Sequence, residues 1–95
     1  MRFEEINNPS YEKIWDELSK GDKKVLCAIN SLSKKNENSL VKVEEIRELT
    51  EMTSNTFTTY RKRLIDNGLV DGKQYGFLAL KLPRFGEFID MCPAP

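Results

Sequence analysis

The sequence has no histidine and only two cysteines among its 95 residues. Without histidine it lacks the commonest general acid–base group, and no pair of carboxylates stands apart from ordinary surface charge. Cys27 and Cys92 show neither metal-type spacing nor a disulfide pattern, and Cys27 falls within a helical apolar stripe that predicts a core thiol. We therefore expect no enzymatic activity, no catalytic residue and no metal or cofactor.

Long apolar stretches are also missing from the sequence. No run approaches the roughly 18 apolar residues that a membrane span requires. Residues 1–8 are acidic and polar, unlike a secretory signal. We therefore expect a cytoplasmic protein with no membrane partner, in which residues 1–8 form an N-terminal arm.

An excess of charge of either sign is missing as well, because 15 Lys and Arg residues balance 15 Asp and Glu residues. A net charge of zero argues against indiscriminate binding to polyanions. The charge is nevertheless distributed in blocks, with basic stretches at 20–43 and 54–84. Any contact with nucleic acid would therefore have to be made by one surface.

The strongest pattern lies in residues 43–67 and predicts two short helices joined by a tight turn. Apolar residues recur at helical spacing in each half, and the phase of the pattern changes between the halves. Thr53 and Ser54 can start the second helix by accepting bonds from its first N–H groups. Gly68 suits the left-handed position just after the helix, where Leu69 can pack back on Leu64.

The rest of the chain predicts one small domain over residues 1–95. Asn8 and Pro9 open a helix that runs to about residue 19, with Trp15 in the core. Asp22 can cap a second, central helix that ends near Leu32. The remaining predicted elements are a polar loop at 33–39, a short strand at 40–42, a hairpin at 69–82 and a C-terminal helix at 83–91.

In the predicted hairpin, Asp71 and Gly72 supply the positive-φ residues of a tight turn. The second strand, 75–82, is apolar on both faces, so one face is left to be covered by the C-terminal segment or by a partner. This order of elements is that of a winged helix-turn-helix, an α+β fold that is mainly helical with a small antiparallel hairpin wing and a short C-terminal helix.

Three runs, 11–29, 54–70 and 75–89, together resemble the C-terminal winged-helix domain attached to AAA+ ATPases of the origin-recognition-like archaeal and bacterial type. The resemblance covers about residues 10–90, and its most specific parts are FTTYRKRLIDNGLV at 57–70 and LPRFGEFI at 82–89. It implies a domain that contacts DNA or packs against a partner or the ATPase core. A G-x-x-x-x-G-K-[ST] loop does not occur here, so no nucleotide hydrolysis is expected of these residues.

For DNA binding, the second helix of the pair must turn a polar face to the major groove while its apolar stripe stays in the core. Asn can pair with adenine, Thr can meet a thymine methyl, and Lys and Arg can bind guanine or phosphate. A solvated helix face with no function would look the same. The predicted contacts with double-stranded DNA are Ser54, Asn55, Thr56, Thr58, Thr59, Lys62 and Arg63, with Lys73 at the tip of the wing.

Two features argue against DNA. The first helix of the pair is acidic, with Glu44, Glu45, Glu48 and Glu51, although Glu near a helix N-terminus also has an ordinary explanation in the helix dipole. The wing is short and has one lysine in its turn. The alternative is a protein–protein interaction or regulatory module that docks on an ATPase domain or another protein; the sequence favours no oligomeric state. Its predicted partner interface is Phe77, Phe85, Phe88 and Met91.

Overall fold

The computed structural model describes residues 9–35, 40–82 and 84–92, and these residues form five helices and three short strands. The predicted α+β class is confirmed. The predicted N-terminal arm, the Asn8 cap and part of the 33–39 loop lie outside the described residues. The elements are α2 (Pro9–Glu17), α3 (Lys20–Ser33), β1 (Val41–Lys42), α4 (Val43–Thr50), α5 (Ser54–Asp66), β2 (Val70–Asp71), β3 (Phe77–Leu80) and α6 (Phe85–Met91).

The three strands form one antiparallel sheet with β3 in the centre, between β1 and β2. Val41 of β1 pairs with Leu78, and Val70 of β2 pairs with Leu80. Because β1 leads directly into α4 and β2 follows α5, the strand β3 ties down both ends of the α4–α5 pair. The helix pair and the sheet therefore form one unit.

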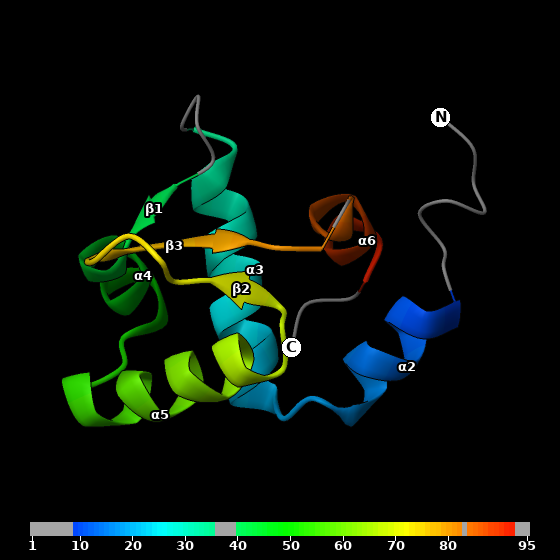
Figure 1. Ribbon diagram of the computed structural model, residues 1–95, viewed down its shortest axis with the longest axis horizontal. Coiled ribbons are helices and arrows are strands. Elements are labelled where there is room, and N and C mark those ends of the chain that lie inside the picture. Colours follow the sequence, from blue (N-terminus) through cyan, green and yellow to red (C-terminus); the bar gives the residue numbers. More distant parts are fainter. Residues whose placement is uncertain (1–8, 36–39, 83, 93–95) are drawn as a thin grey trace.

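The helix α3 runs through the middle of the molecule (Figure 1). It contacts α4, α5, α6, β1 and β3. The helix α4 and the beginning of α5 lie at one end of the molecule, and α2 lies at the other end, with α6 between α3 and α2 (Figure 1). The position of α3 explains why its inward residues, Val25, Leu26 and Ile29, are fully buried.

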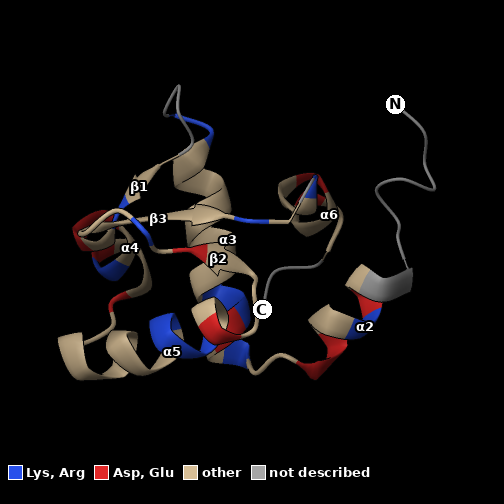
Figure 2. Cartoon of the chain, in the orientation of Figure 1, with Lys and Arg blue, Asp and Glu red and all other residues tan. Residues whose placement is uncertain are grey.

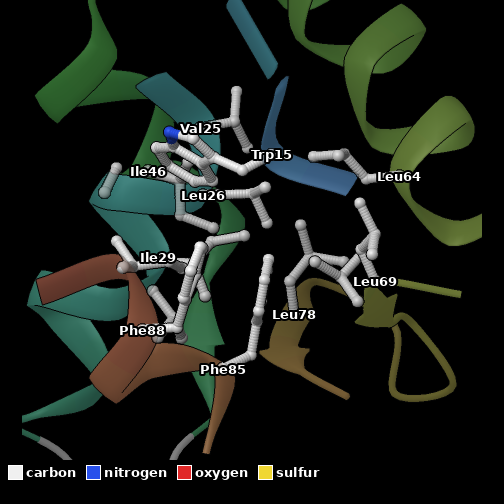
Figure 3. Close-up of a cluster of buried hydrophobic side chains, with 14 of the residues drawn as sticks. Trp15, Val25, Leu26, Ile29, Ile46, Leu64, Leu69, Leu78, Phe85 and Phe88 are labelled. Carbon is white, nitrogen blue, oxygen red and sulfur yellow. The ribbon is translucent and has the colours of Figure 1, made fainter. Parts of the chain in front are cut away.

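The core combines aliphatic side chains of α3 with residues from every other part of the fold (Figure 3). Trp15 is 6% exposed, which confirms its predicted place in the core. Phe85 and Phe88 of α6 pack edge-on against Tyr11 of α2, with ring centroids 5.1 and 6.0 Å apart. The buried set is Trp15, Val25, Leu26, Ala28, Ile29, Val41, Ile46, Phe57, Leu64, Leu69, Val70, Leu78, Phe85, Phe88 and Ile89.

The predicted boundaries of the second helix of the pair are confirmed. Thr53 is the N-cap of α5, and its side chain accepts a hydrogen bond from the N–H of Thr56. At the other end, Gly68 has a φ of 74°, and the N–H of Leu69 donates to the carbonyl of Leu64 over 3.0 Å. The start and the stop of α5 are therefore encoded locally.

The predicted start of α3 was wrong. Ser19, not Asp22, is the N-cap: its hydroxyl accepts from the N–H of Asp22, and the Asp22 carboxylate accepts from the N–H of Ser19 at 3.1 Å. This capping box satisfies two N–H groups that the helix itself leaves unpaired. Asp22 lies in the first turn of α3 and is 4% exposed, so it belongs to the interior.

The predicted hairpin turn was also wrong in detail. Gly76, with a φ of 82°, is the positive-φ glycine of the β2–β3 loop, and β3 begins at Phe77 instead of residue 75. Gly72 matters for a different reason, since a Cβ placed there would lie 2.7 Å from Cδ1 of Ile65. The loop thus packs closely on α5. The C-terminal helix likewise starts at Phe85, because Arg84 has a φ of 58°.

Candidate functional site

The site is built on α5, which Phe57 and Leu64 anchor in the core. One turn of a helix places residues three and four apart on the same side. The remaining surface of α5 therefore divides into three strips. We call them the α3 side (Thr56, Tyr60 and Arg63), the groove side (Ser54, Thr58 and Arg61) and the outer side (Asn55, Thr59 and Lys62).

The α3 side is occupied by an ion-pair network. Arg63, a predicted DNA contact, places Nη2 at 3.1 Å from both carboxylate oxygens of Asp22 and at 3.4 Å from the hydroxyl of Ser19. Its guanidinium also lies over the ring of Tyr60, 5.2 Å from the ring centroid. Because the Asp22 side chain is only 5% exposed, Arg63 neutralises an otherwise buried charge. The role of Arg63 is therefore to hold α5 against the start of α3.

Thr56 belongs to the same side of α5 and also has an internal role. Its N–H and its hydroxyl both contact the hydroxyl of Thr53, at 3.3 and 3.0 Å. Thr56 is therefore part of the cap of α5. The hollow beside this network, about 450 Å³, is lined by residues of α2, α3 and α5 that include Ser19, Asp22 and Arg63.

The groove side of α5 faces a hollow of about 600 Å³. The opposite wall is the start of α4, and the end of the hollow is formed by the beginning of β3 and the loop before it. We call this hollow the basic groove, since it brings together Lys42, Arg47 and Arg61 with a single carboxylate, Glu44. Val43, Phe57 and Phe77 supply its apolar lining, and Ser54, Thr58, Tyr75 and Gly76 complete it.

Among the described residues, the cations of the basic groove form no ion pair. Arg47 has a buried Nε atom with no hydrogen-bond partner among the described residues. Within the same part of the chain, the ion pairs involve Lys34, Arg63 and Arg84, and none involves Lys42, Arg47 or Arg61. Cationic side chains that line a hollow without an ion-pair partner favour an anionic ligand.

Sequence reasoning missed all three of these cations. Arg61 lies four residues after Phe57 and so is close to the apolar stripe, which is why it was not counted among the outward residues. The spacing of Ser54, Thr58 and Arg61, four and three residues, could have identified the groove side. Lys42 and Arg47 come from another part of the chain, and their approach to α5 depends on the packing of α4.

The outer side of α5 is exposed along its length. The hydroxyl of Thr59 donates to the carbonyl of Asn55 at 3.3 Å, and that of Thr58 donates to the carbonyl of Ser54 at 2.8 Å. These threonines therefore present methyl groups and acceptor oxygens to an incoming ligand. Basic residues of α5 lie only in its C-terminal half, and the N-terminal half has no charged residue (Figure 2).

The loop between β2 and β3 contains the last predicted DNA contact. Lys73 is exposed, and its N–H donates to the Asp71 carboxylate at 2.9 Å. Tyr75, in the same loop, is 97% exposed and lines the mouth of the basic groove. The sequence-predicted residues thus fall into separate groups: Ser54 and Thr58 in the groove, Asn55, Thr59 and Lys62 outside, and Arg63 and Thr56 toward α3.

The predicted partner interface does not exist as one surface. Phe85 is fully buried and Phe88 is 4% exposed, because both rings pack into the core against α2. Phe77 is half-buried in the basic groove, and Met91 is 48% exposed. The two central aromatic residues are therefore unavailable to a partner.

The two cysteines are half-buried free thiols. Burial raises the pKa of the Cys27 thiol, and the carboxylate of Asp90 raises it further. Burial also raises the pKa of Cys92, and Cys27 adds to that shift. No group of three or more acidic or cysteine side chains in the described ranges could hold a metal ion. The raised pKa favours the protonated form of both thiols at neutral pH.

None of the helices in the described ranges is long and apolar enough to cross a membrane.

No curated protein and no solved structure matches the chain. Residues 9–89 match the family described as a domain of unknown function, DUF8462. The match begins with α2 and ends within α6, so it includes the helix pair, the sheet and both hollows. The chain belongs to the DUF8462 family.

Proposed function

We propose that this chain is a winged-helix domain, sequence-tolerant or regulatory, that binds double-stranded DNA through the outer side of α5. The order α3, β1, α4, α5, β2, β3 and the sheet order β1-β3-β2 support the winged-helix assignment. In this assignment α5 is the recognition helix and the β2–β3 hairpin is the wing. The resemblance to the domain attached to AAA+ ATPases agrees with this role.

The outer side of α5 is the observation that carries the proposal. Asn55 and Lys62 are exposed, and within the described part of the chain no hydrogen bond or ion pair occupies either side chain. Asn55 is in the first turn of α5, where a recognition helix is closest to base edges. Lys62 is two turns further along and is placed for a phosphate.

Charge sets the expected strength of this binding. The net charge is zero, and α4, the other helix of the pair, carries Glu44, Glu45 and Glu48. A protein that contacts few phosphates has modest affinity and a shallow dependence on salt. We therefore expect weak binding with little sequence preference by the isolated chain, of the kind that a larger assembly would strengthen by presenting several copies.

The alternative, an interaction module without a nucleic-acid role, loses one of the features that favoured it. Both central rings of the aromatic tail are in the core, so they are not offered to a partner. The net charge of zero still fits this alternative, whereas the exposed polar residues on the outer side of α5 favour DNA.

Fluorescence anisotropy with a short labelled DNA duplex at low salt tests the proposal. We expect measurable binding by the full chain, and Lys62→Gln should weaken it by about threefold to tenfold through the loss of one phosphate contact. Lys13→Gln, on the exposed surface of α2, is the matched control and should leave the affinity unchanged. If no duplex binds at low salt, or if both variants act alike, the proposal is contradicted.

A further inference from the structure

The basic groove has the size and the walls of a small-ligand site. Its volume of about 600 Å³ falls within the range of sites that take small molecules. Val43, Phe57 and Phe77 give it an apolar lining, and Lys42, Arg47 and Arg61 are its cationic groups. The groove is separate from the outer side of α5, since none of Asn55, Thr59 and Lys62 lines it.

The charges of the groove select an anion. Elsewhere in the described chain, arginine heads are held by carboxylates, as Arg63 is by Asp22 and Arg84 is by Glu87. Arg47 and Arg61 have no such partner, and Nε of Arg47 is buried without a hydrogen bond. Two arginines that line one hollow suit a phosphate, because a phosphate accepts several charge-assisted hydrogen bonds at once.

The exposed ring of Tyr75 favours an anion that also carries an aromatic base. It is 97% exposed, more than Leu49 at 53% or Met91 at 48%, and it stands at the mouth of the groove. An exposed ring at a hollow that cationic side chains also line is suited to stacking on a nucleobase while the cations hold the adjoining phosphate. An acidic peptide could use the cations, but it would leave the ring without a partner.

We propose that the basic groove binds one unpaired nucleotide, with its phosphate on Arg47 and Arg61 and its base on Tyr75. A base inside a duplex has both faces covered by its neighbours, so only a terminal or unpaired base can stack on Tyr75. The inference rests on the proposed function, because α5 would hold a duplex beside the groove and thereby deliver its single-stranded end. The preferred substrate is then a duplex with a single-stranded tail.

Anisotropy titrations of a blunt duplex and of the same duplex with a thymidine tail test this inference, with the tail placed at the 3′ end in one probe and at the 5′ end in another. We expect at least one tailed probe to bind about fivefold or more tightly than the blunt one, which is the gain that stacking of a single base provides. Tyr75→Ala and Arg61→Gln should abolish the gain and leave the affinity for the blunt duplex unchanged. Tyr75→Phe should retain the gain, since it keeps the ring.

The outcomes separate the two proposals. If blunt and tailed probes bind equally, or if Tyr75→Ala keeps the gain, the groove inference is overturned and the duplex-binding proposal stands. If no probe binds, both are overturned. If polyglutamate competes with the tail as effectively as a thymidine oligonucleotide does, the groove takes carboxylates and the inference fails. Tyr75→Ala removes a side chain that is 97% exposed, so thermal unfolding should show an unchanged midpoint.

Discussion

Arg61 and Arg63 are two residues apart in α5, yet the fold uses them in opposite ways. Arg63 turns toward α3 and completes a network with Asp22, Ser19 and Tyr60. Arg61 turns toward α4 and the β2–β3 loop, where it meets other cations and no carboxylate partner in the described chain. An arginine that pairs with a buried carboxylate, as Arg63 does, stabilises the fold. An arginine without such a partner, as Arg61 is, remains available to a ligand.

The two arginines differ because the acidic residue near Arg63 is buried and the acidic residue in the groove of Arg61 is exposed. Asp22 is buried because it belongs to the capping box at the start of α3, and a buried carboxylate requires a cation. Among the described residues that line the basic groove, the acidic one is Glu44, and it is exposed, so it does not require a cation. The arginine on the α3 side therefore has its partner within the fold, whereas Arg61 on the groove side has no carboxylate partner among the described residues.

The largest expected effect comes from removing the acid on the α3 side. Asp22→Ala should lower the free energy of unfolding by about 2–4 kcal/mol, because it removes half of a capping box and leaves Arg63 and the N–H of Ser19 without their acceptor. Urea denaturation measures this loss. Asp66→Ala, at an exposed site of the same helix as Arg63, is the control and should change stability by less than about 0.5 kcal/mol.

Adding a side chain at Gly21, on the α3 side, should have the next largest effect on the free energy of unfolding. A Cβ at Gly21 would overlap the ring of Tyr60, so Gly21→Ala should cost about 1–3 kcal/mol although alanine is the better helix former. Thermal unfolding of Gly21→Ala and of Ser31→Ala, an exposed position of α3, makes the comparison. A Gly21→Ala variant as stable as the wild type would mean that Tyr60 is not packed on α3.

The two arginines themselves can be compared directly. Arg63→Gln should destabilise the protein by about 1–2 kcal/mol, while Arg61→Gln should change stability by less than about 0.5 kcal/mol, because only Arg63 has a buried partner. A double-mutant cycle of Asp22→Asn with Arg63→Gln should show coupling, and the same cycle with Arg61→Gln should show none. Equal effects of the two arginine changes would remove the distinction between the two sides.

The smallest expected effect is at Gly72, next to Arg61 of the basic groove. A Cβ at Gly72 would lie 2.7 Å from Cδ1 of Ile65 and 3.3 Å from Nη2 of Arg61. Both atoms are at the ends of flexible side chains, so Gly72→Ala should cost only about 1 kcal/mol. It should also displace Arg61 and reduce the gain from a single-stranded tail. Unfolding and anisotropy measured on the same preparation test both effects, and a full tail-dependent gain would argue against a role for Arg61.

The elements of the fold could be predicted from the sequence because their signals are local. Thr53 and Gly68 mark the ends of α5 within a few residues of the helix itself, and the apolar stripe identifies Phe57 and Leu64 as anchors. The start of α3 was misassigned because Ser19 and Asp22 are both good capping residues, and the choice between them depends on which one the fold buries.

The candidate site could be predicted only in part, since it depends on contacts between distant segments. Asp22 and Arg63 are 41 residues apart in the chain, so no local pattern pairs them. The basic groove combines residues from α4, α5 and the β2–β3 loop, and its unpaired Arg47 is visible only when these segments are assembled. The exposed position of Tyr75 likewise follows from the late start of β3 at Phe77.

The most direct test of the account is the salt dependence of duplex binding for the wild type, Lys62→Gln and Arg63→Gln. We expect log Kd of the wild type to rise linearly with log salt concentration. Lys62→Gln should reduce the slope by about 0.9, which corresponds to one phosphate contact, and Arg63→Gln should leave the slope unchanged although it lowers stability. Absence of binding at low salt, or a slope that depends on Arg63 and not on Lys62, would contradict the proposal that α5 binds DNA by its outer side.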